Sequence, residues 1–176
     1  MNKKLRLLVT TRCPNKCPMC CNNSWDFSKL PVVDRWNYDE IMITGGEPLL
    51  FASELPVLIS SIRYLESMQG SNPSKIYLYT ADCSYNMINT MTYLDGVVLT
   101  PHNKLALEYF VKSNLYFLKY PRRVKNKSLR LNLFPDMKAL LPKDIDLSLW
   151  KVKDMEWIEN CPVPEGEDFR RIAELW

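Results

Sequence analysis

The chain has little of what several common protein classes require. It contains one histidine, His102, in 176 residues, so a histidine-rich zinc site or a Ser-His-Asp triad has little material. No apolar run approaches the roughly 20 residues of a membrane-spanning helix. The basic start is followed by an apolar stretch, 5–9, that contains Arg6 and is too short for a signal-peptide core. We therefore expect a cytoplasmic protein with no membrane partner.

The overall composition is that of an ordinary globular protein, with 47% apolar and 24% charged residues. The length fits a single domain over residues 1–176. A net charge of +3 is too small to favour a nucleic-acid partner. Four of the six cysteines lie within nine residues, 13–21. Such crowding disfavours a disulfide scaffold and predicts a metal site, because thiolates bind soft metals tightly.

Apolar runs of strand length alternate with helical patterns along the chain. Helices are predicted with Ser53 and Ser84 as N-caps and with a start at Asn103, while residues 22–39 give mixed signals. This alternation predicts parallel βαβ units, too few to close an eight-stranded barrel. The predicted fold class is α/β, a partial (β/α)6-type TIM-like barrel with parallel strands. Strands are predicted at 5–10, 41–44, 76–80, 96–100 and 129–134, with a sixth within 150–158, where a helix is the competing prediction.

Two stretches that each follow a predicted strand carry the chemistry. Cys13, Cys17 and Cys20 have the spacing C-x3-C-x2-C, and three thiolates can bind three irons of a [4Fe–4S] cluster, leaving one iron open. The segment 45–48, Gly-Gly-Glu-Pro, lets the backbone approach a ligand closely, and the carboxylate of Glu47 can accept hydrogen bonds from an ammonium group. Because parallel sheets bind ligands at the carboxyl ends of their strands, both stretches are expected at one site.

This combination of motifs resembles the radical S-adenosylmethionine (SAM) superfamily. The resemblance implies a minimal radical SAM core, with SAM on the open iron and reductive cleavage to a 5′-deoxyadenosyl radical. That radical would abstract hydrogen from an unidentified small-molecule or protein substrate, and a flavodoxin- or ferredoxin-type protein would donate the electron. The implied cluster ligands are Cys13, Cys17 and Cys20, and the implied contacts of the SAM methionine moiety are Gly45, Gly46, Glu47 and Pro48.

One position departs from the pattern of the superfamily. Met19 stands before the last cluster cysteine, where an aromatic residue is usual, and we expect it to pack against the adenosyl group instead. In the superfamily, further SAM contacts come from the ends of later strands. By position these contacts are expected at Thr80, His102 and Asn132, and these three assignments are less specific than the Gly-Gly-Glu-Pro motif.

Other interpretations of the cysteines are open at this point. A structural zinc site would take Cys21 or Cys161 as its fourth ligand; otherwise Cys21 is an incidental thiol, and Cys83 and Cys161 are small core residues. The stretch 17–22 with Trp25 is similar to the activating enzymes of anaerobic ribonucleotide reductase, which act on a protein partner to form a glycyl radical. The rival of a different class is a non-catalytic iron–sulfur or zinc-binding interaction module.

Charge is unevenly distributed in the second half of the chain. The segment 119–130 contains six lysines and arginines and no acid, and 154–168 contains six acids and no base. A solvated connection is the simplest interpretation of the basic segment, and a grip on an anionic substrate or nucleic acid is the alternative.

Overall fold

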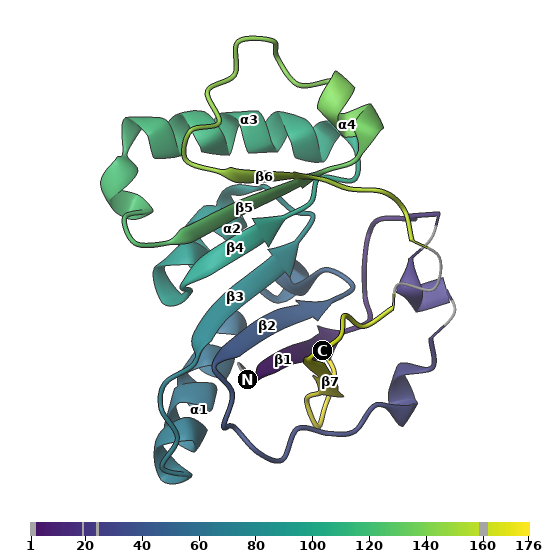
Figure 1. Ribbon diagram of the computed structural model, residues 1–176, viewed down its shortest axis with the longest axis vertical. Helices are drawn as coiled ribbons and strands as arrows, with labels where there is room; N and C mark the ends of the chain where they lie inside the picture. Colours follow the sequence, from purple (N-terminus) through teal and green to yellow (C-terminus); the bar gives the residue numbers. More distant parts are fainter. Residues whose placement is uncertain (1–2, 19, 24, 159–161) are drawn as a thin grey trace.

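The molecule is organised around one parallel sheet. The computed structural model describes residues 3–18, 20–23, 25–158 and 162–176, with the backbone alone for Cys21. Within these residues seven strands pair in parallel in the order β6-β5-β4-β3-β2-β1-β7 (Figure 1). Their pairings leave β6 and β7 as the two edges, so the described strands form an α/β sheet that is open. The strands are β1 (Lys4–Thr10), β2 (Glu40–Gly45), β3 (Lys75–Thr80), β4 (Gly96–Leu99), β5 (Ser128–Leu133), β6 (Lys151–Asp154) and β7 (Glu167–Arg171).

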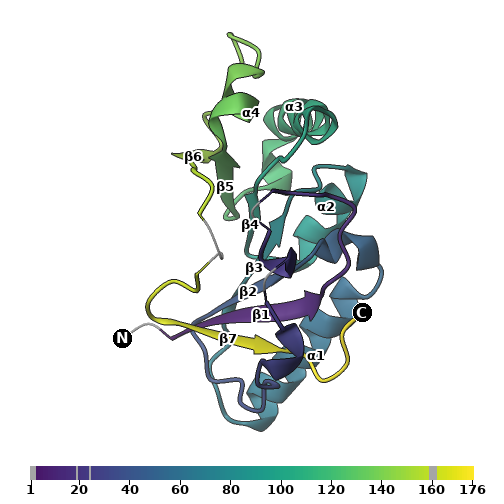
Figure 2. The same ribbon diagram turned by 90° about the vertical axis from the view of Figure 1, so that its right-hand side faces the viewer.

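The α-helices cover one face of this sheet (Figure 2). Alternate strand residues such as Leu5, Ile41, Ile76 and Val97 are fully buried in the core beneath them, as the two-residue period of a strand requires. We call the opposite side of the sheet the open face. The helices are α1 (Leu55–Met68), α2 (Tyr85–Thr90), α3 (Lys104–Lys119) and α4 (Pro135–Ala139), with short 3-10 helices η1 (Cys21–Asn23), η2 (Phe27–Lys29), η3 (Pro48–Phe51), η4 (Met91–Tyr93) and η5 (Pro121–Arg123).

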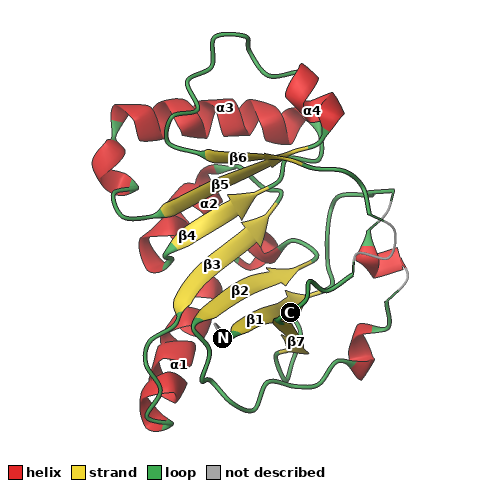
Figure 3. Cartoon of the chain, viewed as in Figure 1, coloured by secondary structure: helices red, strands yellow, loops and turns green. Residues whose placement is uncertain are grey.

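The strands predicted from apolar runs are all present. The segment 150–158 contributes β6 and not a helix, whereas β7 was not predicted. Its sequence, EDFRR, has a single apolar residue, Phe169, because edge strands tolerate charge that central strands do not. The described residues of the ambiguous segment, 22–23 and 25–39, form loop together with the end of η1 and the whole of η2 (Figure 3).

Two of the three predicted helix starts are confirmed. Ser84 Oγ accepts a hydrogen bond from Asn86 N (3.3 Å), and Asn103 Oδ1 accepts one from Ala106 N (2.9 Å). The prediction of Ser53 as an N-cap was wrong, since Glu54 occupies that position without a side-chain cap bond. The hydroxyl of Ser53 donates to Glu54 Oε2 (2.7 Å), and Pro56 lies in the first turn of α1, where its missing N–H costs nothing.

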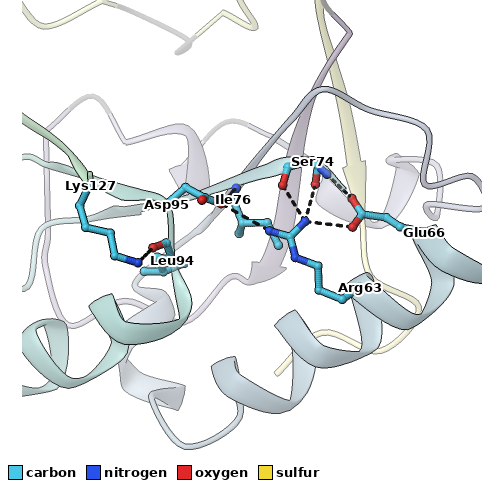
Figure 4. A network of polar contacts seen from close by, with 7 residues as sticks. All are labelled: Arg63, Glu66, Ser74, Ile76, Leu94, Asp95 and Lys127. Carbon is cyan, nitrogen blue, oxygen red and sulfur yellow. Dashed lines mark hydrogen bonds and ion pairs between the residues drawn. The ribbon is translucent and has the colours of Figure 1, made fainter. Parts of the chain in front are cut away.

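A polar network ties α1 to the amino-terminal ends of the central strands (Figure 4). Arg63 Nη1 donates to Glu66 Oε2 (3.0 Å) and to the carbonyl oxygen of Ser74 (2.6 Å). Ser74 N donates to Glu66 Oε1 (2.9 Å), and Asp95 Oδ2 lies 3.4 Å from Arg63 Nη2. Lys127 Nζ bonds the backbone carbonyl that precedes Asp95. These contacts fix the amino-terminal ends of the central strands, at the end of the sheet opposite the cysteine loop.

No described helix combines the length and the apolar character needed to cross a lipid bilayer.

Candidate active site

The cysteine loop begins where β1 ends. Cys13, Cys17 and Cys20 are free thiols, each partly buried. The loop turns back on itself, since Cys20 N donates to Cys17 O (3.3 Å) and Asn23 N to Cys20 O (2.9 Å). Burial, followed by the nearby thiols of Cys20 and Cys13, raises the pKa of Cys17 to about 11. Burial also raises the pKa of Cys13, with Glu47 and Cys20 adding to it. The three cysteines therefore lie in one loop that follows β1 and is closed by its own backbone hydrogen bonds.

The end of β2 is bonded directly to the start of this loop. Gly46 N donates to Thr10 O and Glu47 N donates to Arg12 O, each at 2.8 Å. A Cβ atom on Gly46 would lie 2.1 Å from Arg12 O, and one on Gly45 would lie 2.2 Å from Thr10 O. Gly45 also has φ +149°, which side chains rarely adopt. The glycine pair is thus required by the close approach of the two backbone segments.

Glu47 is a buried carboxylate, 2% exposed, at the end of β2. Its Oε1 accepts from Leu49 N (3.0 Å) and Thr80 Oγ1 (2.6 Å). Its Oε2 accepts from Ala81 N (2.9 Å) and Asp82 N (3.2 Å). Burial raises the pKa of Glu47, and the hydrogen bonds from Thr80 and the backbone oppose that rise. Four donors of the chain itself occupy the carboxylate, which joins the end of β2 to the end of β3.

The predicted contacts at later strand ends lie along the same carboxyl edge of the sheet. Thr80 ends β3 and meets Glu47 directly, as described above. Asn132 in β5 donates from Nδ2 to Thr100 Oγ1 (3.2 Å), just after β4. Asn103 Nδ2 donates to Asn15 Oδ1 (3.0 Å). The cysteine loop therefore reaches from β1 across to the loop that follows β4.

His102 lies against aromatic rings at the ends of β4 and β5. Its ring centroid is 5.6 Å from that of Phe134 and 5.4 Å from that of Trp157, and the latter two rings stack at 4.0 Å. Its Nδ1 is buried and has no hydrogen-bond partner among the described residues. Burial lowers the pKa of His102, with Asp136 opposing. A neutral imidazole with an unpaired ring nitrogen is thus placed at the carboxyl edge.

Four contacts at the base of the cysteine loop were not predicted from the sequence. Thr10 Oγ1 donates to Trp176 O (2.8 Å) and accepts from Arg12 N (3.1 Å). The Trp176 ring lies 5.5 Å from the Phe51 ring, and the Arg12 guanidinium lies 5.8 Å from the same ring. Trp176, at the far end of the sequence, thus supports the segment before Cys13, and no local signal in the sequence pointed to these contacts.

The donor chemistry of the loop fits an iron–sulfur cluster. Three unpaired thiols supply three of the four soft ligands that such a cluster takes. Among the described residues, no group of three or more His, Cys, Asp and Glu side chains is placed to hold a single metal ion. Thiols that each bind a different iron need not converge on one ion. Met19, Cys161 and the side chain of Cys21 lie outside the described residues.

Comparison with known proteins gives one relevant similarity. No family model matches the sequence. The chain is 30% identical over 113 residues to GTP 3',8-cyclase from Synechococcus sp. (strain WH7803). The similarity covers 58% of this chain and 29% of that protein, so the chain corresponds to less than a third of its relative's length.

Proposed function

We propose that this chain is a radical SAM enzyme, built as a single domain over residues 1–176. One observation carries the proposal: the backbone at Gly46 and Glu47 is hydrogen-bonded to Thr10 and Arg12, immediately before Cys13. The two motifs that define the resemblance thus meet at one point of the carboxyl edge. The similarity to GTP 3',8-cyclase, a radical SAM enzyme, supports the superfamily.

Each motif has a distinct task in this proposal. Cys13, Cys17 and Cys20 ligate three irons of a [4Fe–4S] cluster, and SAM occupies the fourth. The chemistry supplied by cluster and SAM together is reductive cleavage of the sulfonium bond, which gives a 5′-deoxyadenosyl radical for hydrogen abstraction. A small electron-transfer protein of the flavodoxin or ferredoxin type provides the electron.

The segment 45–48 acts mainly through its backbone. The acceptor positions of the Glu47 carboxylate are taken by the chain's own donors, so it orients the segment, and main-chain groups of Gly45 and Gly46 meet the methionine moiety of SAM. Pro48 begins η3 and fixes the exit from this turn. His102 and Asn132 supply further SAM contacts from the ends of β4 and β5. The parallel sheet with its site at the carboxyl ends corresponds to a partial TIM-like barrel.

Anoxic reconstitution with iron and sulfide, followed by reduction in the presence of SAM, tests this function. We expect 5′-deoxyadenosine as a chromatographic product of the native chain, and a loss of at least a hundredfold in Cys17→Ala. Cys83→Ala is the matched control, because Cys83 belongs to the hydrophobic core and its Sγ contacts the carbonyl oxygen of Ala81 (3.7 Å), and it should retain cleavage. Full cleavage by Cys17→Ala, or one zinc ion per chain with no product, contradicts the proposal and favours a binding module.

A further inference from the structure

Asn15 lies between two of the proposed cluster ligands and faces the same side of the cysteine loop as they do. Cys13, Asn15 and Cys17 are each partly buried, whereas the residues at positions 14, 16 and 18 are exposed. Such alternation is typical of an extended chain, in which every second side chain points to the same side. The amide of Asn15 is therefore on the side of the loop on which a cluster would be bound.

Asn15 is also bonded to the start of α3. Its Oδ1 accepts a hydrogen bond from Asn103 Nδ2 (3.0 Å). Asn103 is the N-cap of this helix, and its own Oδ1 accepts from Ala106 N (2.9 Å). One side-chain amide thus makes two contacts, one within the first turn of α3 and one to the cysteine loop, 88 positions away.

The two contacts of Asn103 fix the orientation of Asn15. An asparagine amide has one acceptor oxygen and one donor NH2 group. The helix cap requires the oxygen of Asn103 to face Ala106 N, so the NH2 group of Asn103 faces Asn15. Asn15 then presents its oxygen to Asn103, and its own NH2 group points in another direction. The capping requirement of α3 thereby decides which group of Asn15 is left for the cysteine loop.

The remaining NH2 group of Asn15 is directed to Cys13. Burial raises the pKa of the Cys13 thiol, and hydrogen bonds from the backbone N–H and the side-chain amide of Asn15 oppose that rise. Both groups are donors to this sulfur, and a donor stabilises a thiolate. Hydrogen bonds to the sulfurs are among the features that set the reduction potential of an iron–sulfur cluster, because they stabilise the more negatively charged, reduced form.

We propose that Asn15 donates hydrogen bonds to the Cys13 ligand of the bound cluster and raises its reduction potential, and that Asn103 holds Asn15 in the orientation this requires. The inference rests on the proposed function and adds two positioning residues to it. Asn15 acts through Cys13, and Asn103 acts through Asn15. The cluster is thereby easier for the electron donor to reduce, and loss of the NH2 group lowers the potential.

Redox titration of the reconstituted full-length chain, carried out without SAM and followed by the electron paramagnetic resonance signal of the reduced cluster, tests the proposal. Asn15→Leu keeps the branched shape of asparagine and removes its donor. We expect a roughly tenfold smaller reduced-to-oxidised ratio at a fixed applied potential, which is a fall of about 59 mV in the midpoint of a one-electron couple. Asn103→Ser keeps a capping hydroxyl for α3 but loses the NH2 group that reaches Asn15, and it should shift the midpoint in the same direction by a smaller amount.

Asn23→Leu is the matched control, because Asn23 is an exposed neutral amide in the segment that follows Cys20, and it should change the ratio less than twofold. Hydrogen exchange of the iron-free protein adds a readout that needs no cluster. The backbone amides of residues 13–17 should exchange about fivefold faster in Asn103→Ser than in the native chain, because the loop loses its bond to α3.

Unshifted midpoints in Asn15→Leu or in Asn103→Ser overturn the proposal, and so does a shift of equal size in Asn23→Leu. Faster exchange with native potentials also contradicts it, since the two asparagines then only hold the loop in place. A native chain that takes up no cluster refutes both the proposed function and this inference. A native chain that takes up a cluster and cleaves SAM, with unshifted midpoints in the variants, refutes this inference alone.

Discussion

Replacing Glu47 with glutamine is the sharpest test of how the two motifs are held together. The carboxylate accepts four hydrogen bonds at 2.6–3.2 Å. A glutamine keeps one acceptor oxygen, and its NH2 group then faces two donors that it cannot satisfy. Two lost bonds to a charged group correspond to about 3–6 kcal/mol. Burial disfavours the ionised carboxylate, so replacing it with a neutral amide offsets part of this loss. We therefore expect a net destabilisation of about 2–4 kcal/mol.

Urea unfolding of Glu47→Gln at pH 7.5, followed by circular dichroism, measures this change. Glu54→Gln is the control, because Glu54 is exposed and its carboxylate accepts only from the neighbouring Ser53; it should stay within about 0.5 kcal/mol of the native chain. If the unfolding free energy of Glu47→Gln is as close to that of the native chain as the control's is, the reasoning is refuted. A loss of SAM affinity with native stability would instead show that the carboxylate contacts the ligand.

Two further predictions concern stability away from the motifs. Arg63→Ala removes the partner of Glu66, which is 1% exposed, and should lower the free energy of urea unfolding by about 2–4 kcal/mol. The control Lys29→Ala breaks an exposed ion pair with Asp26 and should cost under about 1 kcal/mol. Equal effects of the two variants would contradict a stabilising role of the polar network around Arg63. Because burial lowers the pKa of His102 in the folded chain, the unfolded chain binds more protons between that lowered value and the ordinary pKa of about 6.5. Stability should therefore fall as pH decreases from 7.5 to 5.5, and His102→Phe should reduce this slope in urea unfolding; an unchanged slope would exclude the sole histidine as its source.

Local patterns were sufficient to predict most of the fold. β4 is a continuous apolar run that is buried throughout, and β1 is apolar except for Lys4, Arg6 and Thr10, so both could be predicted as strands from their own composition. β7 escaped prediction because its pairing with β1 depends on a residue separation of more than 150 positions and not on its own composition. The wrong cap at Ser53 shows the limit of a single-residue signal, since the Ser53 hydroxyl bonds the Glu54 side chain instead of a helix N–H.

The candidate site, like the fold, has one part that could be predicted from the sequence and one part that could not. The cysteine and Gly-Gly-Glu-Pro motifs are contiguous in sequence, so their residue types were visible without a structure. Their supports were not visible, because each lies far away in the chain. Three of the four donors to Glu47 are more than 30 positions distant, and Thr10 bonds Trp176 across 166 positions. Only folding brings such partners together, and no spacing rule anticipates them.

The two halves of the sheet are built on different principles, and this has a consequence for how such an enzyme can change. Around β1 and β2, backbone hydrogen bonds and glycines without room for a Cβ fix the arrangement, so almost any substitution at Gly45 or Gly46 displaces the cysteine loop. Around β5 and β6 the sheet ends in an edge strand, β6, whose four residues are all exposed. Substitution there alters charge without disturbing the core. On the proposed function, the arrangement of the cysteine loop is therefore fixed by the main chain, while residues of the β6 edge can be exchanged at little cost in stability.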